Sequence, residues 1–167
     1  GVIYNNKCSS LLLKSIYDTT VQKAEKEMLL ELSLKYCDSS IYVYNKWIDE
    51  WLKLNPGEIR ERLKLSMNRA DPAFNGFDFE KIFERRLKNI IQAQTETPRR
   101  LSVSLTNKGT IYRHMMMPDS SLVLYKKALS LWKENRTAKS NLSVLYGGDP
   151  VKTSIIESLF PPDKNKK

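Results

Sequence analysis

Apolar residues recur every three or four positions through most of the first 95 residues, which is the spacing of an amphipathic helix. After a short apolar segment at residues 11–17, this spacing predicts a helix over about residues 20–37, with Met28 and Leu32 on its apolar side. A second helix is expected after Ser39 or Ser40, and Asn55-Pro56 interrupts it. The first third of the chain is therefore predicted to be helical.

The next helices carry recognisable start signals. Asn55 is placed as an N-cap, with Pro56 at the first helical position and Glu58 at the third. Residues 70–77 are rich in turn formers and predict a loop. Asp78 is then expected to cap a further helix, which Thr97-Pro98 closes because the residue before a proline disfavours the helical conformation.

The period of the pattern changes after residue 100. Leu, Val and Leu alternate with Ser, Ser and Thr over residues 101–106, and residues 107–109 offer an Asn and a Gly at turn positions. We therefore expect one β-hairpin at residues 101–116. A helix from Pro118, a short segment at 142–146 and a final short helix ending at Phe160 follow, before a basic tail at 161–167 that we expect to be mobile.

These elements predict a mainly α fold. We expect a single helical domain over residues 1–160, with about five to six helices and the small antiparallel hairpin. The order of elements over residues 58–116 resembles that of a winged helix, with a recognition helix followed by a wing. This resemblance is an analogy at the level of the fold.

The net charge is distributed unevenly. The chain has 167 residues, with 28 Lys and Arg against 19 Asp and Glu, for a formal charge of +9. Residues 1–97 are nearly balanced, whereas residues 98–167 hold thirteen basic against five acidic side chains, a net +8. A basic segment attached to a neutral one favours a polyanionic partner.

The candidate binding residues are basic side chains with one aromatic among them. Lys81, Arg85 and Lys88 follow one side of the predicted recognition helix, where they could lie along phosphates. The remaining candidates lie in the loop after that helix and on the hairpin: Arg99, Arg100, Lys108, Tyr112 and Arg113. The alternative is an ordinary solvated helix face, in which Glu84 pairs with Lys88 four residues later.

Three functions are compatible with these features. The first is a non-enzymatic domain of a larger protein that binds RNA or DNA. The second is a helical docking module with an acidic protein partner. The third is a metal-dependent nuclease using Asp119 and Glu134. The single histidine, His114, and the absence of a phosphate-binding loop argue against other catalysis, and no cofactor motif is present.

The two cysteines, Cys8 and Cys37, lack the spacing of a zinc site. We expect both to be buried or incidental thiols in a reducing intracellular compartment, the cytoplasm or the nucleus. No apolar run is long enough to span a bilayer. The chain begins with Gly rather than Met, so we expect it to be part of a longer polypeptide.

Overall fold

The computed structural model describes residues 1–151. The short helix expected to end at Phe160 and the 161–167 tail lie outside these described residues. Six α-helices and one short 3₁₀ turn make up the described part: α1 (Val2–Tyr17), α2 (Lys23–Trp51), α3 (Pro56–Ser66), η1 (Pro72–Phe74), α4 (Phe79–His114), α5 (Pro118–Leu131) and α6 (Arg136–Leu145).

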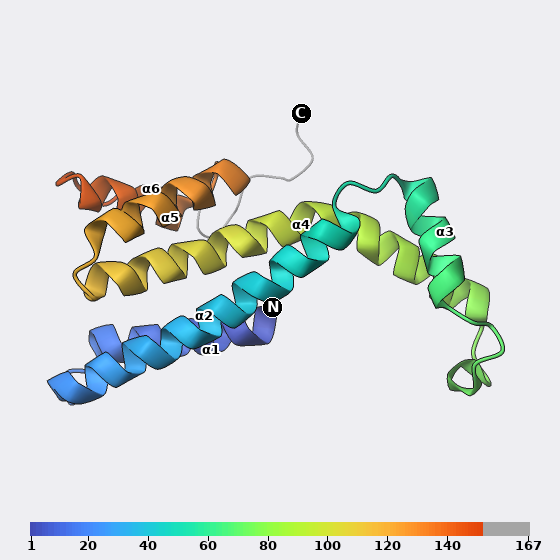
Figure 1. The fold of residues 1–167 in the computed structure, drawn as a ribbon, viewed down its shortest axis with the longest axis horizontal. Helices are drawn as coiled ribbons and strands as arrows, with labels where there is room; N and C mark the ends of the chain where they lie inside the picture. Colours follow the sequence, from blue (N-terminus) through green and yellow to red (C-terminus); the bar gives the residue numbers. More distant parts are fainter. Residues whose placement is uncertain (152–167) are drawn as a thin grey trace.

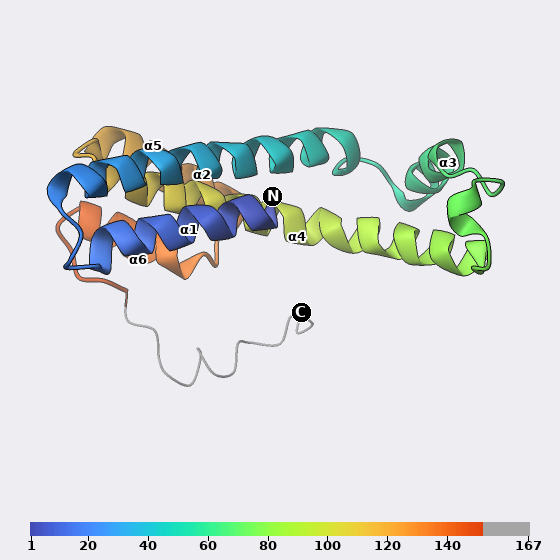
Figure 2. The same cartoon turned by 90° about the horizontal axis from the view of Figure 1, so that it is seen from below.

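The helices form an elongated bundle organised around α4. Figure 1 shows α2 and α4 running along the long axis, with α5 and α6 on the side of α4 away from α1 and α2. The short α3 lies at the far end, against the first turns of α4, and this end is called the tip. Figure 2 shows the tip separated from the opposite end of the molecule, where α1, α5 and α6 pack around α2 and α4 and which is called the bundle end.

Apolar side chains gather in three clusters along the bundle. The first joins Leu12 of α1 and Leu30 of α2 to Ile111 of α4. The second packs Tyr44 and Leu105 against α5 and α6. The third holds the tip together and contains Ile59, Leu63, Phe83, Leu87 and Ile90, with Trp47 and Trp51 packed against them. Burial of these side chains is the main force that fixes the helix positions.

The prediction of a β-hairpin at residues 101–116 is wrong, and the wing of the winged-helix analogy is therefore absent from the described residues. Within residues 1–151 the structure has no β-strand, and residues 101–114 are the second half of α4. This half is covered by α1 and α2 on one side and by α5 and α6 on the other. A helix surrounded in this way buries several faces, so its sequence lacks a single apolar stripe.

The alternating Ser and Thr residues are buried and hydrogen-bonded inside the bundle. The Ser102 hydroxyl donates to the carbonyl of Ala128 in α5 at 2.7 Å, and the Thr106 hydroxyl donates to the carbonyl of Ser102 at 2.9 Å. The Asn135 side chain, which N-caps α6, donates to both hydroxyl oxygens at 2.8 and 2.9 Å. These bonds offset the cost of burying polar groups. The alternation of apolar and polar residues over residues 101–106 therefore comes from a helix that is buried on two sides, not from a strand.

Pro98 does not end the helix, contrary to the expectation. It lies inside α4, and Figure 1 shows α4 bending near its middle. A proline lacks the amide hydrogen needed for the helical bond to the fourth preceding residue, and a bend accommodates its ring. Beside it, the Gln94 amide donates to the carbonyls of Trp51 and Leu54 at 2.8 and 2.7 Å, which ties α4 to the end of α2.

The expected break at Ser39 or Ser40 is also absent. Helix α2 runs without interruption through both residues. The Ser40 hydroxyl is buried and lies 2.9 Å from the hydroxyl of Ser104 in α4, so it links two helices rather than capping one. The start signals further on are confirmed: Asn55 and Glu58 form a capping box on α3, and the Asp78 side chain accepts from the Lys81 amide at the start of α4.

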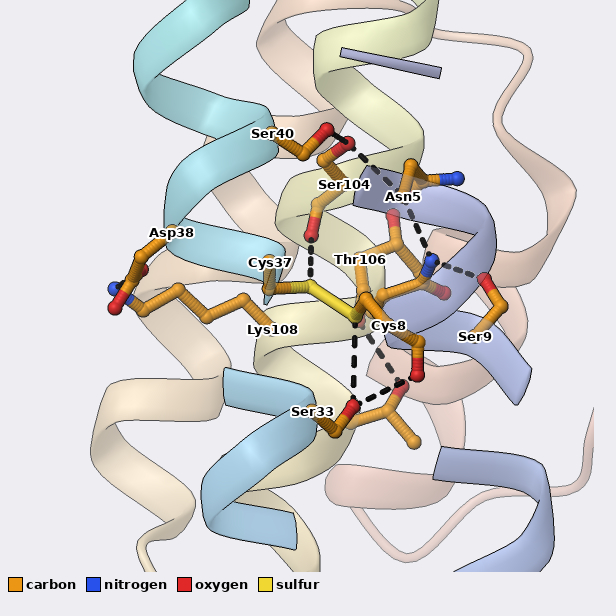
Figure 3. Close-up of a disulfide and its surroundings, with 12 residues drawn as sticks. Asn5, Cys8, Ser9, Ser33, Cys37, Asp38, Ser40, Ser104, Thr106 and Lys108 are labelled. Atoms are coloured by element: carbon orange, nitrogen blue, oxygen red, sulfur yellow. Dashed lines mark hydrogen bonds and ion pairs between the residues drawn. A yellow bond between two sulfur atoms is a disulfide. The ribbon is translucent and has the colours of Figure 1, made fainter. Parts of the chain in front are cut away.

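The cysteines are not free thiols. Cys8 of α1 and Cys37 of α2 form a disulfide that is fully buried between the two helices (Figure 3). Ser33 lies beside it and donates to the Cys8 carbonyl at 2.8 Å. Disulfides are typical of oxidising compartments, so this bond argues against the expected reducing compartment. Among the helices of residues 1–151, none is both long and apolar enough to cross a membrane.

Candidate polyanion-binding surface

The first half of α4 presents a basic side to solvent. Phe83, Leu87 and Ile90 face α3 and the end of α2, and they are buried. Residues three or four positions apart share a helix face, so Lys81, Arg85 and Lys88 project from the opposite side, where all three are exposed. These three residues are called the basic stripe. It spans about 10 Å along the helix axis, from the rise of 1.5 Å per residue.

The acidic residues of the same helix are paired elsewhere. Glu84 accepts two hydrogen bonds from Arg60 of α3, at 2.6 and 3.0 Å, and these bonds lower the pKa of the Glu84 carboxyl. Glu80 lies 3.6 Å from Arg69 in the loop before η1. The Glu84–Lys88 pair of the alternative interpretation is therefore not formed.

The basic stripe itself is left without partners in the described structure. Across residues 1–151, the side chains of Lys81, Arg85 and Lys88 form no hydrogen bond or ion pair. Three exposed cations along about 10 Å of helix, at the rise of 1.5 Å per residue, create a local positive potential. No carboxylate of the described residues is paired with them to neutralise it. The stripe can therefore bind an extended polyanion without first breaking ion pairs within the protein.

Two other predicted residues are engaged in contacts with neighbouring side chains of the bundle. Arg99 is half-buried, forms an ion pair with Glu96 at 3.2 Å and stacks over the Trp132 ring at 5.7 Å. Lys108 bonds Asp38 of α2 at 2.5 Å and lies 5.5 Å from the Tyr112 ring. Both cations hold helices together, which makes them poorly available to a ligand.

The last three predicted residues lie apart from the stripe. Arg100 is exposed on α4, and Tyr112 and Arg113 are half-buried near its end. Lys81 and Arg113 are 32 positions apart, which corresponds to about 48 Å of helix. The structure therefore brings together Lys81, Arg85 and Lys88 but does not gather the eight predicted residues into one site.

The basic C-terminal half presents further cations on another surface. Lys126 and Lys127 are exposed on α5, and Lys133 is exposed just after it. In the sequence these lysines contribute to the net charge of residues 98–167, but their spacing does not point to a binding site. They enlarge the positive potential of the bundle end.

The carboxylates of the nuclease interpretation do not converge. Asp119 lies in the first turn of α5, whereas Glu134 follows the end of the same helix and pairs with Lys139 at 3.2 Å. The helix between them is about 20 Å long, so one cation cannot contact both carboxylates. Across residues 1–151, no group of three or more His, Cys, Asp or Glu side chains is placed to hold a metal ion.

A second surface of the molecule was missed by the sequence analysis. A groove of about 460 Å³ runs between α1 and α2, and we call it the α1–α2 groove. Its lining is mostly apolar, and the residues are Ile3, Asn6, Lys7, Ser10, Leu11, Leu32 and Tyr36. The apolar and aromatic residues within residues 2–17 were the sequence feature that could have indicated it. These residues form one complete helix, rather than the short segment expected at 11–17.

The chain matches no protein-family model, no curated protein and no solved structure.

Proposed function

We propose that the protein is a non-enzymatic helical domain that binds the phosphate backbone of nucleic acid through the basic stripe. The observation that carries this proposal is the pairing of Glu84 with Arg60, which leaves Lys81, Arg85 and Lys88 exposed and unneutralised. Phosphate contacts supply most of the affinity in binding that does not depend on base sequence. No base preference is proposed, because the stripe offers charge without a defined set of base-edge contacts.

The experiment is a fluorescence-polarisation titration with single-stranded RNA, single-stranded DNA and duplex DNA at low salt. The triple variant K81Q/R85Q/K88Q should bind about 10- to 100-fold more weakly than the wild type, since each cation neutralises about one phosphate. Absence of binding by the wild-type protein at low salt would refute the proposal.

A matched control separates the stripe from the overall charge. Lys23, Lys35 and Lys46 are exposed lysines of α2, and K23Q/K35Q/K46Q removes the same net charge from another surface. This variant should keep nearly the wild-type affinity. Equal losses in the two variants would show that net charge, and not the stripe, attracts the polyanion.

Because the disulfide argues for an oxidising compartment, a second type of polyanion should be tested in the same titration. Oxidising compartments also expose proteins to sulfated polysaccharides, whose anionic groups could occupy the same stripe. Heparin should therefore be titrated as a competitor. Binding of heparin with no binding of any nucleic acid would assign the stripe to a sulfated glycan and overturn the nucleic-acid proposal.

A helical docking module is the second candidate function. The observation that favours it is the exposed apolar lining of the α1–α2 groove, which lies away from the basic stripe. The two functions are compatible within one molecule, because they use different surfaces.

A further inference from the structure

We propose that His114, Met116 and Met117 bind a soft monovalent metal ion, copper(I), at the corner where α4 ends and α5 begins (Figure 1). These residues lie outside the basic stripe, and they would act through coordination rather than through charge. Metal binding at this corner is therefore independent of nucleic-acid binding, and either proposal can fail without the other.

The donor atoms at this corner suit a soft metal ion. The chain has five methionines, and three of them follow its single histidine directly, at residues 115–117. Thioether sulfur is a soft donor that suits copper(I), and imidazole nitrogen also binds copper. The cysteine sulfurs do not compete for the ion, because Cys8 and Cys37 are joined in a disulfide. In the oxidising compartment that this bond indicates, thioethers and imidazole are the soft donors that remain.

The backbone folds the three residues into one compact turn. The Met117 amide donates to the Tyr112 carbonyl at 2.9 Å, and the Met116 amide donates to the Arg113 carbonyl at 3.1 Å. This pair of bonds is the Schellman motif, which folds the residues after a helix against its last turn. His114 belongs to that last turn, so its imidazole and the two flexible thioethers start from neighbouring points of the backbone.

Met116 adopts a backbone conformation that is unusual for its residue type. Its φ is 60°, and it is the only residue other than glycine with a positive φ in residues 1–151. Glycine usually occupies this position of the Schellman motif, because a Cβ atom is unfavourable in the left-handed region. Packing of the side chain does not offset this cost, since Met116 is 86% exposed. Backbone strain that packing does not explain is typical of functional sites.

The three donors are accessible to an incoming ion. Met117 is 47% exposed and His114 is exposed, and within residues 1–151 the His114 side chain has no hydrogen-bond or ion-pair partner. Met115 is not included, because it packs against the first apolar cluster. The partial negative charge at the end of α4 favours a cation there. The half-buried Arg113 opposes it, and a monovalent ion meets only half the repulsion that a divalent ion would.

The test is a silver(I) titration of the full chain, followed through the NMR signals of the methionine methyl groups. Silver(I) has the charge and soft character of copper(I) and requires no reductant, so the disulfide stays intact. The signals of Met116 and Met117 should shift until about one equivalent is added, whereas those of Met28 and Met67 should not. Copper(I) supplied anaerobically in acetonitrile should give the same pattern. Zinc(II) should shift none of these signals, because thioethers are not its usual ligands.

The decisive variant is M116L/M117L, which removes both sulfurs and nearly conserves side-chain volume. It should bind silver(I) at least about 10-fold more weakly than the wild type in a calorimetric titration, since loss of an outer-shell contact alone costs a metal site about 10-fold. H114Q should weaken binding in the same direction.

The matched control is M28L/M67L, which removes the sulfurs of the two methionines outside the corner and should bind silver(I) like the wild type. Circular dichroism should show that all three variants are folded, because the substituted side chains of the corner are exposed. Absence of a shift with silver(I) or copper(I), equal shifts of all five methionine signals, or wild-type affinity in M116L/M117L would each overturn the proposal.

Discussion

Arg99 and Arg100 are neighbours in α4 with different surroundings. Arg99 pairs with Glu96 and stacks over Trp132, while the side chain of Arg100 is exposed. We expect R99A to lower the free energy of unfolding by about 1 kcal/mol, the sum of a modest ion pair and a cation–π contact. R100A should change it by less than about 0.5 kcal/mol, as is typical of surface substitutions. Urea denaturation of both variants measures the difference, and equal effects would contradict the assigned contacts.

Gly109 allows α4 and α5 to approach closely. A Cβ atom at this position would lie 2.7 Å from Cε1 of Tyr125, whose side chain is fully buried in α5. The G109A variant should therefore lose about 1–3 kcal/mol of stability through overpacking, despite the better helix propensity of alanine.

The control for this substitution is N89A, at an exposed position of the same helix. It should leave stability unchanged or raise it slightly, because alanine favours the helix more than asparagine does. If G109A proves as stable as N89A in urea denaturation, the close contact between Gly109 and Tyr125 is not present in solution.

At the scale of the helices, the disulfide fixes α1 on α2. It closes a loop with a sequence separation of 29 residues, which corresponds to a stabilisation of about 3–4 kcal/mol in the chain-entropy description. The C8A/C37A variant should lose about this much free energy of unfolding, and adding a reductant to it should have no further effect.

A thiol assay tests the same bond directly. The denatured protein without reductant should contain no reactive thiol, because Cys8 and Cys37 are joined. Two reactive thiols under these conditions would show that the native protein is reduced, and would restore the original expectation of a reducing compartment.

The starts of the helices with local capping signals could be predicted from the sequence, whereas the second half of α4 could not. Asn55, Pro56 and Asp78 act locally, through bonds within one turn, so they indicated the starts of α3 and α4 correctly. The second half of α4 is buried on several faces by helices distant in sequence. Its buried Ser and Thr residues therefore imitated the alternation of a strand.

The candidate site shows the same limit. The spacing of Lys81, Arg85 and Lys88 was sufficient to predict a shared exposed face, because it depends on one helix alone. The Trp132 ring under Arg99 and the Asp38 carboxylate beside Lys108 come from segments remote along the chain. No local pattern could indicate that these two cations are engaged by tertiary contacts.

At the scale of the whole molecule, the basic stripe and the α1–α2 groove lie on different parts of the bundle. The basic stripe lies at the tip, and the α1–α2 groove lies at the bundle end (Figure 1). Binding of a polyanion to the stripe should therefore weaken as salt is added, whereas docking of an apolar partner in the groove should not.

The salt dependence of nucleic-acid binding tests the central claim most directly. With a duplex oligonucleotide between about 50 and about 200 mM salt, the wild-type log–log slope should be about −3 or steeper, and K81Q/R85Q/K88Q should reduce its magnitude by about 2–3. The control K23Q/K35Q/K46Q should retain the wild-type slope. An unchanged slope in the stripe variant would show that these three residues contact no phosphates and would contradict the account.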